Sequence, residues 1–205
     1  VSGTVAQVAQ PVFSSIDNDN ERLCNVFRKM VRFTAFLSFP VMFGLAIISQ
    51  EFIILAIGSK WAESVFLLQI LCISGAFLPL HGTFQNLIIS KGRSDLYLWG
   101  NIGLLLSSIV LIVALGKLGI VIMIVAYSIL NIGWVAVWQY YAHKLIGLKF
   151  MDTLKDIFPF FISALAVMSI SYFIASFVDS MVLRLIIKMI LSVVIYFTVM
   201  KLAKV

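Results

Sequence analysis

Charged side chains are scarce in this 205-residue sequence: Asp, Glu, Lys and Arg make up 12% of it, whereas hydrophobic residues make up 62%. Soluble domains carry about 25% charged and 45–50% apolar residues. A domain of this size has too much surface to hide such an excess of apolar residues from water. The composition therefore excludes an ordinary soluble domain. It predicts a membrane protein, whose helices each use about 20 apolar residues to cross a hydrocarbon core about 30 Å thick.

Residues that usually carry catalysis or bind metals are equally scarce. The sequence has two histidines, His81 and His143, and two cysteines, Cys24 and Cys72. Neither histidine lies in a metal-ligand spacing or a Ser/His/Asp grouping, and the cysteines, one in a charged segment and one in an apolar run, are predicted to be free thiols. There is no glycine-rich phosphate loop and no basic stripe interleaved with aromatic residues. We therefore expect no enzyme, no metal site, no cofactor and no nucleic-acid partner.

Six charge-poor runs are long enough to cross a membrane as helices. Upstream of the first run, apolar residues spaced three and four apart from Leu23 to Val31 predict an amphipathic helix that lies on the membrane surface. No Asp or Glu occupies the central part of any run, which argues against an ion-driven pump contained in these residues. The predicted fold class is all-α, a polytopic membrane bundle with six full spans. The runs cover residues 33–50, 64–90, 96–115, 120–142, 157–178 and 181–200.

Basic residues are distributed unevenly between the two predicted sides of the membrane. If residues 16–32, the SKGRSDL turn at 90–96, the 143–156 loop and the C-terminus share one side, that side holds 11 of the 15 Lys and Arg residues. Short loops rich in Lys and Arg remain in the cytoplasm. The sequence therefore predicts a cytoplasmic C-terminus, and SKGRSDL is interpreted as a cytoplasmic hairpin between two spans.

Uncharged polar side chains remain inside the predicted spans. In the fourth run a continuous seam at helical spacing extends from Tyr127 through Asn131, Trp134 and Trp138 to Tyr141. One interpretation is a cavity wall, where amides bind hydroxyl groups and aromatic faces stack on sugar rings. The other is that these side chains join helices and form the interfacial aromatic belt. The substrate-path residues predicted on the first interpretation are His81, Gln85, Asn101, Asn131 and Trp134.

Two further pairs of residues have predicted roles. Arg184 and Lys188 lie one helical turn apart near the start of the last run. They either bind a lipid phosphate or extend to the interface. Pro40 and Pro79 interrupt the first two runs. They either act as hinges for a rocking motion or are ordinary prolines of the kind that membrane helices tolerate.

Four segments of the sequence, taken in order, resemble a known family. They are QPVFSSIDNDNERLCNVFRK, a span with a central FP, IGSKWAESVFLLQIL and SKGRSDL. They resemble the oligosaccharide flippases of the multidrug/oligosaccharidyl-lipid/polysaccharide exporter superfamily, and more narrowly the Wzx-type branch of lipopolysaccharide and capsule biosynthesis. Beyond about residue 100 only the number of spans and the loop lengths agree. The resemblance implies a fourteen-helix transporter of two six-helix lobes and two extra helices, of which this chain is the C-terminal portion.

That resemblance also implies a division of the chain. The sequence begins with Val1 rather than methionine, and we expect it to be part of a longer protein. The implied parts are the end of a preceding membrane helix (1–15), a cytoplasmic amphipathic linker (16–32), four helices of the C-terminal lobe (33–142), a cytoplasmic loop (143–156) and two additional membrane helices (157–205).

The function implied is the flipping of polyprenyl-diphosphate-linked oligosaccharide across the bacterial cytoplasmic (inner) membrane by alternating access. The expected partners are that lipid-linked oligosaccharide, membrane lipids, the N-terminal lobe, and assembly proteins such as the polysaccharide polymerase. One alternative is a drug or cation antiporter of the same superfamily, which needs a protonatable carboxylate that the predicted spans do not show. Others are a membrane-embedded transferase or polymerase, for which the outer loops are too short, and a membrane anchor or scaffold.

Overall fold

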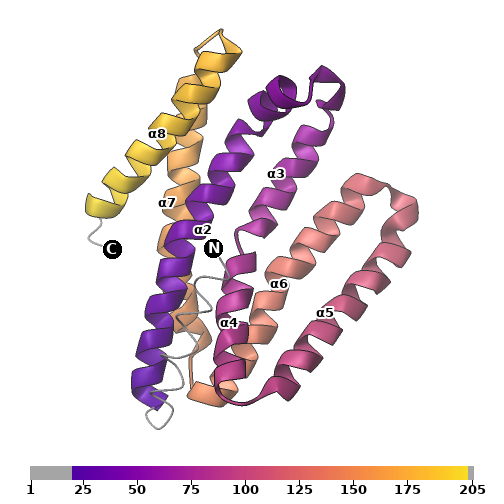
Figure 1. The fold of residues 1–205 in the computed structure, drawn as a ribbon, viewed down its shortest axis with the longest axis vertical. Coiled ribbons are helices and arrows are strands. Elements are labelled where there is room, and N and C mark those ends of the chain that lie inside the picture. The colour runs from indigo at the N-terminus through magenta and orange to yellow at the C-terminus, as the bar shows by residue number, and fades with distance from the viewer. Residues whose placement is uncertain (1–19, 203–205) are drawn as a thin grey trace. The chain divides into compact units, whose positions relative to one another are not determined.

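The computed structural model describes residues 20–202, which are helical throughout apart from short turns (Figure 1). Six helical segments are long and apolar enough to cross a membrane, with α3 and α4 counting together as one. The prediction of an all-α, multi-pass membrane protein is confirmed, while the predictions for residues 1–19 lie outside the described residues. The elements are α2 (Asn20–Ala56), η1 (Ser59–Trp61), α3 (Ser64–Gly75), α4 (Leu78–Ser90), α5 (Ser94–Leu115), η2 (Gly116–Leu118), α6 (Ile120–Ile146), α7 (Phe150–Ala175) and α8 (Met181–Leu202).

The chain divides into two compact units. Among the described residues, the first consists of residues 20–35 and Phe77–Phe158, and the second of Phe36–Ala76 and residues 159–202. Helices α2 and α7 therefore each contribute to both units.

The first unit is built around α6, which packs against α4 and α5. The start of α2 joins this unit through a buried face that contains Leu23, Phe27 and Val31. The ring of Phe27 meets that of Phe84 in α4 edge to face, with centroids 5.1 Å apart. The apolar spacing in the sequence predicted an amphipathic helix with its apolar face on the membrane, whereas that face packs against α4 inside the protein.

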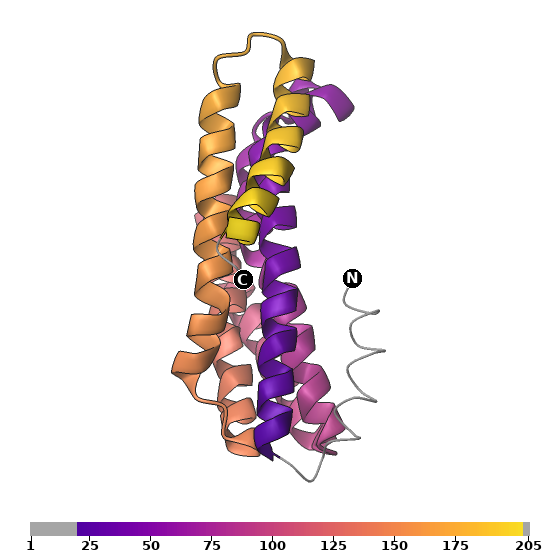
Figure 2. The same cartoon turned by 90° about the vertical axis from the view of Figure 1, so that its left-hand side faces the viewer.

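Helix α2 is longer than the predicted span. Its 37 residues make a rod of about 55 Å, against a hydrocarbon core of about 30 Å. Residues 20–32 are its first turns and run into the span without a break (Figures 1 and 2), so a separate helix lying on the membrane surface is not observed. The helix also continues past residue 50 to Ala56, because the FIILA segment after Glu51 supplies more apolar helical residues.

The second predicted span is two helices rather than one bent helix. Helix α3 ends at Gly75, and α4 begins at Leu78 with Pro79 in its first turn. Proline is well suited to that place because the first turn of a helix leaves its N–H groups without intrahelical partners. Pro40 behaves differently: it lies inside α2, which continues on both sides of it.

The connections on the side predicted to be cytoplasmic are short. In the 90–96 turn Gly92 has φ +69°, and Arg93 donates from Nε and Nη2 to the two carboxylate oxygens of Asp95, both at 2.9 Å. The predicted 143–156 loop is reduced to three residues, because α6 continues to Ile146 and α7 starts at Phe150. Gly147, with φ +71°, ends α6 in the left-handed conformation.

Candidate functional site

The predicted substrate-path residues meet in the first unit, on three neighbouring helices. His81 and Gln85 lie on α4, Asn101 on α5, and Asn131 and Trp134 on α6. His81 and Asn131 are buried, with 5% and 4% of their surface exposed, whereas the other three are partly exposed.

Two pairs of these residues are joined by hydrogen bonds between helices. The Nε2 atom of His81 lies 3.0 Å from the main-chain carbonyl oxygen of Asn131. Because a carbonyl oxygen only accepts, Nε2 of the imidazole carries the hydrogen. The Gln85 amide donates to Oδ1 of Asn101 at 3.3 Å. The two contacts connect α4 to α6 and to α5.

Glycine at two positions of α5 lets the tryptophans of α6 approach closely. A Cβ atom at Gly100 would lie 2.4 Å from the ring of Trp138, and one at Gly103 would lie 3.1 Å from the ring of Trp134. In the gap provided, the indole N–H of Trp134 donates to the Gly100 carbonyl at 3.2 Å. The predicted seam on α6 therefore packs against α5 through Trp134 and Trp138, while Tyr127 remains 38% exposed.

The amide side chains of this cluster also bond within their own helices. Asn101 donates to the Tyr97 carbonyl at 2.8 Å, and Asn131 donates to the Tyr127 carbonyl at 2.9 Å. These contacts hold each side chain in a fixed orientation and compensate its burial in an apolar environment. The arrangement joins three helices and leaves the partly exposed edge of Gln85 and Asn101 as its accessible polar surface.

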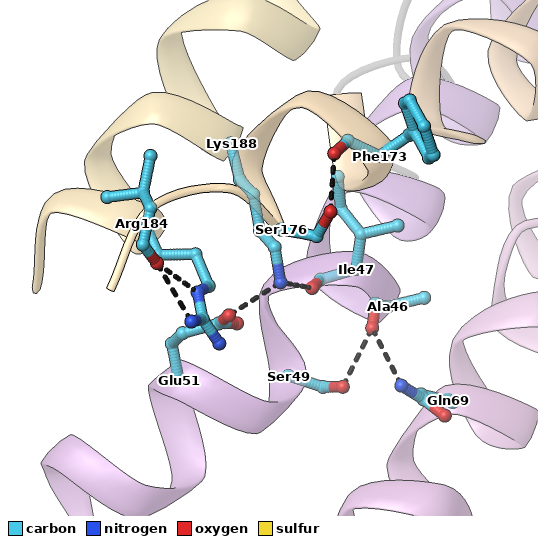
Figure 3. A network of polar contacts seen from close by, with 10 residues as sticks. Ala46, Ile47, Ser49, Glu51, Gln69, Phe173, Ser176, Arg184 and Lys188 are labelled. Carbon is cyan, nitrogen blue, oxygen red and sulfur yellow. Dashed lines mark hydrogen bonds and ion pairs between the residues drawn. The ribbon is translucent and has the colours of Figure 1, made fainter. Parts of the chain in front are cut away.

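A second polar site lies in the second unit, where α8 meets α2 (Figure 3). The ammonium group of Lys188 donates to Oε1 of Glu51 at 2.6 Å and to the carbonyl of Ile47 at 2.9 Å. The Tyr172 ring of α7 lies below the same ammonium group, with its centroid 4.8 Å from Nζ. The side chains of Lys188 and Glu51 are only 2% and 1% exposed, so this is a buried ion pair.

Glu51 corrects one conclusion drawn from the sequence. The predicted first span ended at residue 50, and no protonatable carboxylate was recognised within the spans. In the structure Glu51 is a buried residue of α2, and its Oε2 atom has no hydrogen-bond partner among the described residues. The sequence does carry a signal for this position: apolar residues continue on both sides of Glu51 and form one helix when Glu51 is included.

The structure also gives internal partners to both residues predicted to bind a lipid phosphate. The ammonium group of Lys188 is occupied by Glu51 and Ile47. The guanidinium of Arg184 donates from Nε and Nη2 to the Val178 carbonyl, at 3.1 and 2.8 Å.

The α8 face that carries Lys188 continues as a polar stripe toward the C-terminal end. Pro40 has no N–H to donate to the Phe36 carbonyl one turn earlier, and the Tyr196 hydroxyl of α8 donates to that carbonyl at 3.0 Å. Between these contacts Ser192 lines a cavity of about 390 Å³, whose other walls are almost entirely apolar. Ser192 is 4% exposed. Its hydroxyl group has no hydrogen-bond partner among the described residues.

Comparison with known proteins gives sequence relatives over part of the chain. Residues 1–66 match the family described as polysaccharide biosynthesis protein. An uncharacterized membrane protein in the cps region of Klebsiella pneumoniae is 34% identical over 96 residues, which is 47% of this chain. The teichuronic acid biosynthesis protein TuaB of Bacillus subtilis (strain 168) is 32% identical over 106 residues, or 52% of the chain. The lipopolysaccharide biosynthesis protein WzxC of Escherichia coli (strain K12) is 30% identical over 92 residues, or 45%.

The fold has a solved counterpart that includes nearly the whole chain. The lipid II flippase MurJ, in its inward closed conformation, matches 98% of this chain with a TM-score of 0.70 and 19% sequence identity. The predicted resemblance to membrane proteins of polysaccharide biosynthesis is confirmed by these relatives, and the fold is that of a flippase structure. The chain matches 44% of the MurJ chain, and the matched stretches cover 20%, 22% and 19% of the three sequence relatives. The matched stretches thus span about a fifth of the length of these relatives.

The segment that matches the polysaccharide biosynthesis family includes part of the Glu51–Lys188 site and none of the polar cluster on α4, α5 and α6. The matched segment ends at residue 66 and so contains Glu51 but not Lys188. The polar residues on α4, α5 and α6 lie beyond it. The flippase-like fold therefore includes both sites, whereas the family match reaches only one member of the ion pair.

Proposed function

We propose that this chain is the C-terminal part of a transporter that flips polyprenyl-diphosphate-linked oligosaccharide across the bacterial cytoplasmic membrane, for lipopolysaccharide, capsule or exopolysaccharide synthesis. One observation carries the proposal: a chain with polysaccharide-biosynthesis relatives has, over 98% of its length, the fold of a lipid II flippase. MurJ, as its name states, is a flippase of lipid II. The same fold together with relatives in polysaccharide synthesis supports a related lipid-linked substrate.

Alternating access is compatible with spans whose polar side chains are mainly uncharged amides, hydroxyls and indoles. Such transport requires that the ligand bind the two conformations with different free energies, and it requires no covalent step. The transporter is therefore not an enzyme in this proposal. Its other partners are the N-terminal lobe, membrane lipids and polysaccharide-assembly proteins such as the polymerase. With six spans and most basic residues on one side, the start of α2 and the C-terminus both face the cytoplasm.

Within this chain the accessible polar edge of the first unit is the proposed substrate path. Gln85, Asn101 and Trp134 are partly exposed and offer amide and indole groups suited to sugar hydroxyls and sugar rings. His81 and Asn131 are buried behind them and hold α4 against α6. Replacing these three partly exposed residues should impair transport, and the amount of protein in the membrane separates that effect from any loss of packing between α5 and α6.

The direct test is genetic complementation with the full-length gene. A flippase-null strain should recover surface polysaccharide when it expresses the wild-type protein. A variant with Gln85→Leu, Asn101→Leu and Trp134→Leu should reach the membrane in normal amount and restore little polysaccharide. If the wild-type protein restores none, the proposed function is wrong. If the triple variant restores it fully, these residues are not on the path.

The buried carboxylate supports a second candidate, a proton- or cation-coupled antiporter of the same superfamily. Intramembrane carboxylates are typical of ion-coupled transporters, and Glu51 is buried with one oxygen unpartnered among the described residues. Its pairing with Lys188 at 2.6 Å favours a structural role. Drug efflux driven by a pH gradient in proteoliposomes, and lost in Glu51→Gln, would support the antiporter instead of the flippase.

A further inference from the structure

A cluster of opposite charges joins the start of α2 to the start of α7 in the first unit. Arg28 donates from Nε to Oδ2 of Asp156 at 2.7 Å and from Nη2 to Oδ1 at 3.1 Å. Arg32, one helical turn further along α2, donates from Nε to the same Oδ1 at 2.6 Å. One carboxylate thus receives two guanidinium groups.

The cluster keeps unused hydrogen-bond donors, and a second carboxylate, Asp152, lies close enough to attract Arg28 without a hydrogen bond to it. The Asp156 side chain is 1% exposed, whereas those of Arg28 and Arg32 are 27% and 50% exposed. The buried Asp156 carboxylate therefore holds two guanidinium groups at its open side. The contacts with Asp156 involve Nε and Nη2 of the arginines, and a guanidinium has further N–H donors on Nη1. Such planar donors match phosphate oxygens in pairs.

Both helices place this cluster at the edge of the hydrocarbon core. Arg32 is the last charged residue of α2 before the uncharged stretch 33–50, and Asp156 is the last charged residue of α7 before the uncharged stretch 157–178. Each stretch is long enough to cross most or all of the roughly 30 Å core. The cluster therefore lies at the depth of lipid phosphate groups, on the side of the membrane that the distribution of Lys and Arg makes cytoplasmic.

We propose that Arg28 and Arg32, oriented by Asp156, bind the diphosphate group of a polyprenyl-linked substrate at the membrane boundary. This rests on the proposed function, since it assigns to the flippase an entry site for its substrate's headgroup. Two guanidinium groups one turn apart each engage one phosphate, and the buried carboxylate prevents them from moving apart through mutual repulsion. The polyprenyl chain remains in the adjacent leaflet.

Binding can be measured on the full-length protein in nanodiscs of phosphatidylethanolamine, with undecaprenyl diphosphate as the probe and native mass spectrometry as the readout. Arg32→Gln is the main variant because half of that side chain is exposed. It removes charged hydrogen bonds to phosphate and should lower the affinity about tenfold or more. Lys29→Gln is the matched control: it removes one charge from an exposed position of the same helical turn and should change the affinity less than about threefold.

Each alternative outcome has a separate signature. Equal loss in Arg32→Gln and Lys29→Gln would indicate a general surface potential, and no loss in Arg32→Gln would leave only a contact that fastens α2 to α7; either result overturns the proposal. Equal competition by phosphatidylglycerol would also overturn it, because the site would then bind any anionic lipid. If Arg32→Gln fails to fold, Arg32→Lys keeps the charge but not the planar pair of donors, and its affinity should still fall severalfold; an unchanged affinity there overturns the proposal.

The orienting role of Asp156 needs a readout that a purely structural contact would not change. Asp156→Asn removes the charge but keeps one oxygen acceptor. The ratio of affinities for undecaprenyl diphosphate and undecaprenyl monophosphate should fall several-fold as the two arginines lose their fixed spacing. An unchanged ratio would refute the orienting role. Complementation by the wild-type gene tests the proposed function separately: if it succeeds while Arg32→Gln binds normally, the flippase assignment stands and this site does not.

Discussion

The buried pair of Glu51 and Lys188 allows a quantitative prediction about the second unit. At the 2.6 Å separation of Nζ and Oε1 and an effective dielectric constant of about 20, the attraction is about 6 kcal/mol. Desolvation of both ions offsets most of that attraction, so the net stabilisation by the intact pair is small. Removal of one partner has a larger effect, because the other charge remains in the interior alone.

The two single variants should therefore differ. Lys188→Met leaves Glu51 with neither of its oxygens bonded among the described residues, and should lower the free energy of unfolding by about 3–5 kcal/mol. Glu51→Gln leaves the Lys188 ammonium with the Ile47 carbonyl, the Tyr172 ring and the new amide oxygen, and should cost about 1–2 kcal/mol. The double variant, which has no charge at the site, should lie within about 1 kcal/mol of the wild type.

Denaturation of the full-length protein by SDS in detergent micelles measures these differences. Lys201→Met is the control, because it removes an exposed lysine from the same helix and should cost less than about 0.5 kcal/mol. The reasoning is refuted if Lys188→Met costs no more than this control. It is also refuted if the double variant costs the sum of the single ones, because the two charges would then not interact.

Three further measurements test other parts of the structure. Gly100→Ala should lower stability by about 1–3 kcal/mol because the new methyl group meets a tryptophan ring at 2.4 Å, whereas Gly133→Ala, with no atom within 4 Å of the added Cβ, should be neutral or stabilising; equal effects would contradict the close packing. Tyr196→Phe should cost about 1–3 kcal/mol because it leaves an α2 carbonyl without its donor, and a fully stable variant would show that water or another group serves that carbonyl. In a background without native cysteines, an impermeant thiol reagent should label Lys60→Cys but not Arg93→Cys in intact cells, and labelling of both would refute the predicted orientation.

Local patterns in the sequence predicted the helices and turns that are determined by residues close together along the chain. The apolar spacing around Phe27 predicted an amphipathic helix there, and the charges of SKGRSDL predicted the turn before α5. The predicted ends of the first span do not match those of α2. Hydropathy separates an apolar run from the polar helical turns next to it, although both belong to one helix. Main-chain hydrogen bonding continues through Arg32 and Glu51, since charged residues do not interrupt a helix as glycine or proline does.

The ion pairs could not be predicted in this way, because their partners are far apart along the chain. Glu51 and Lys188 are separated by 137 positions, and Arg28 and Asp156 by 128. A single sequence carries no signal that connects such residues. Considered singly, each charged residue was interpreted as interfacial or as part of a charged loop. The packing of the helices shows which of these residues are buried.

The prolines bear on where a transporter of this fold would bend. The chain passes between the two units at Ala35–Phe36, Ala76–Phe77 and Phe158–Pro159, and each passage lies within five residues of a proline. The passages are not equivalent. The carbonyl freed by Pro40 is bonded by a tyrosine of α8 in the same unit, which opposes bending there. Between α3 and α4 the helix is already interrupted, with Pro79 in the first turn after the break. Of the two predicted hinges, we therefore expect Pro79 to tolerate bending better than Pro40.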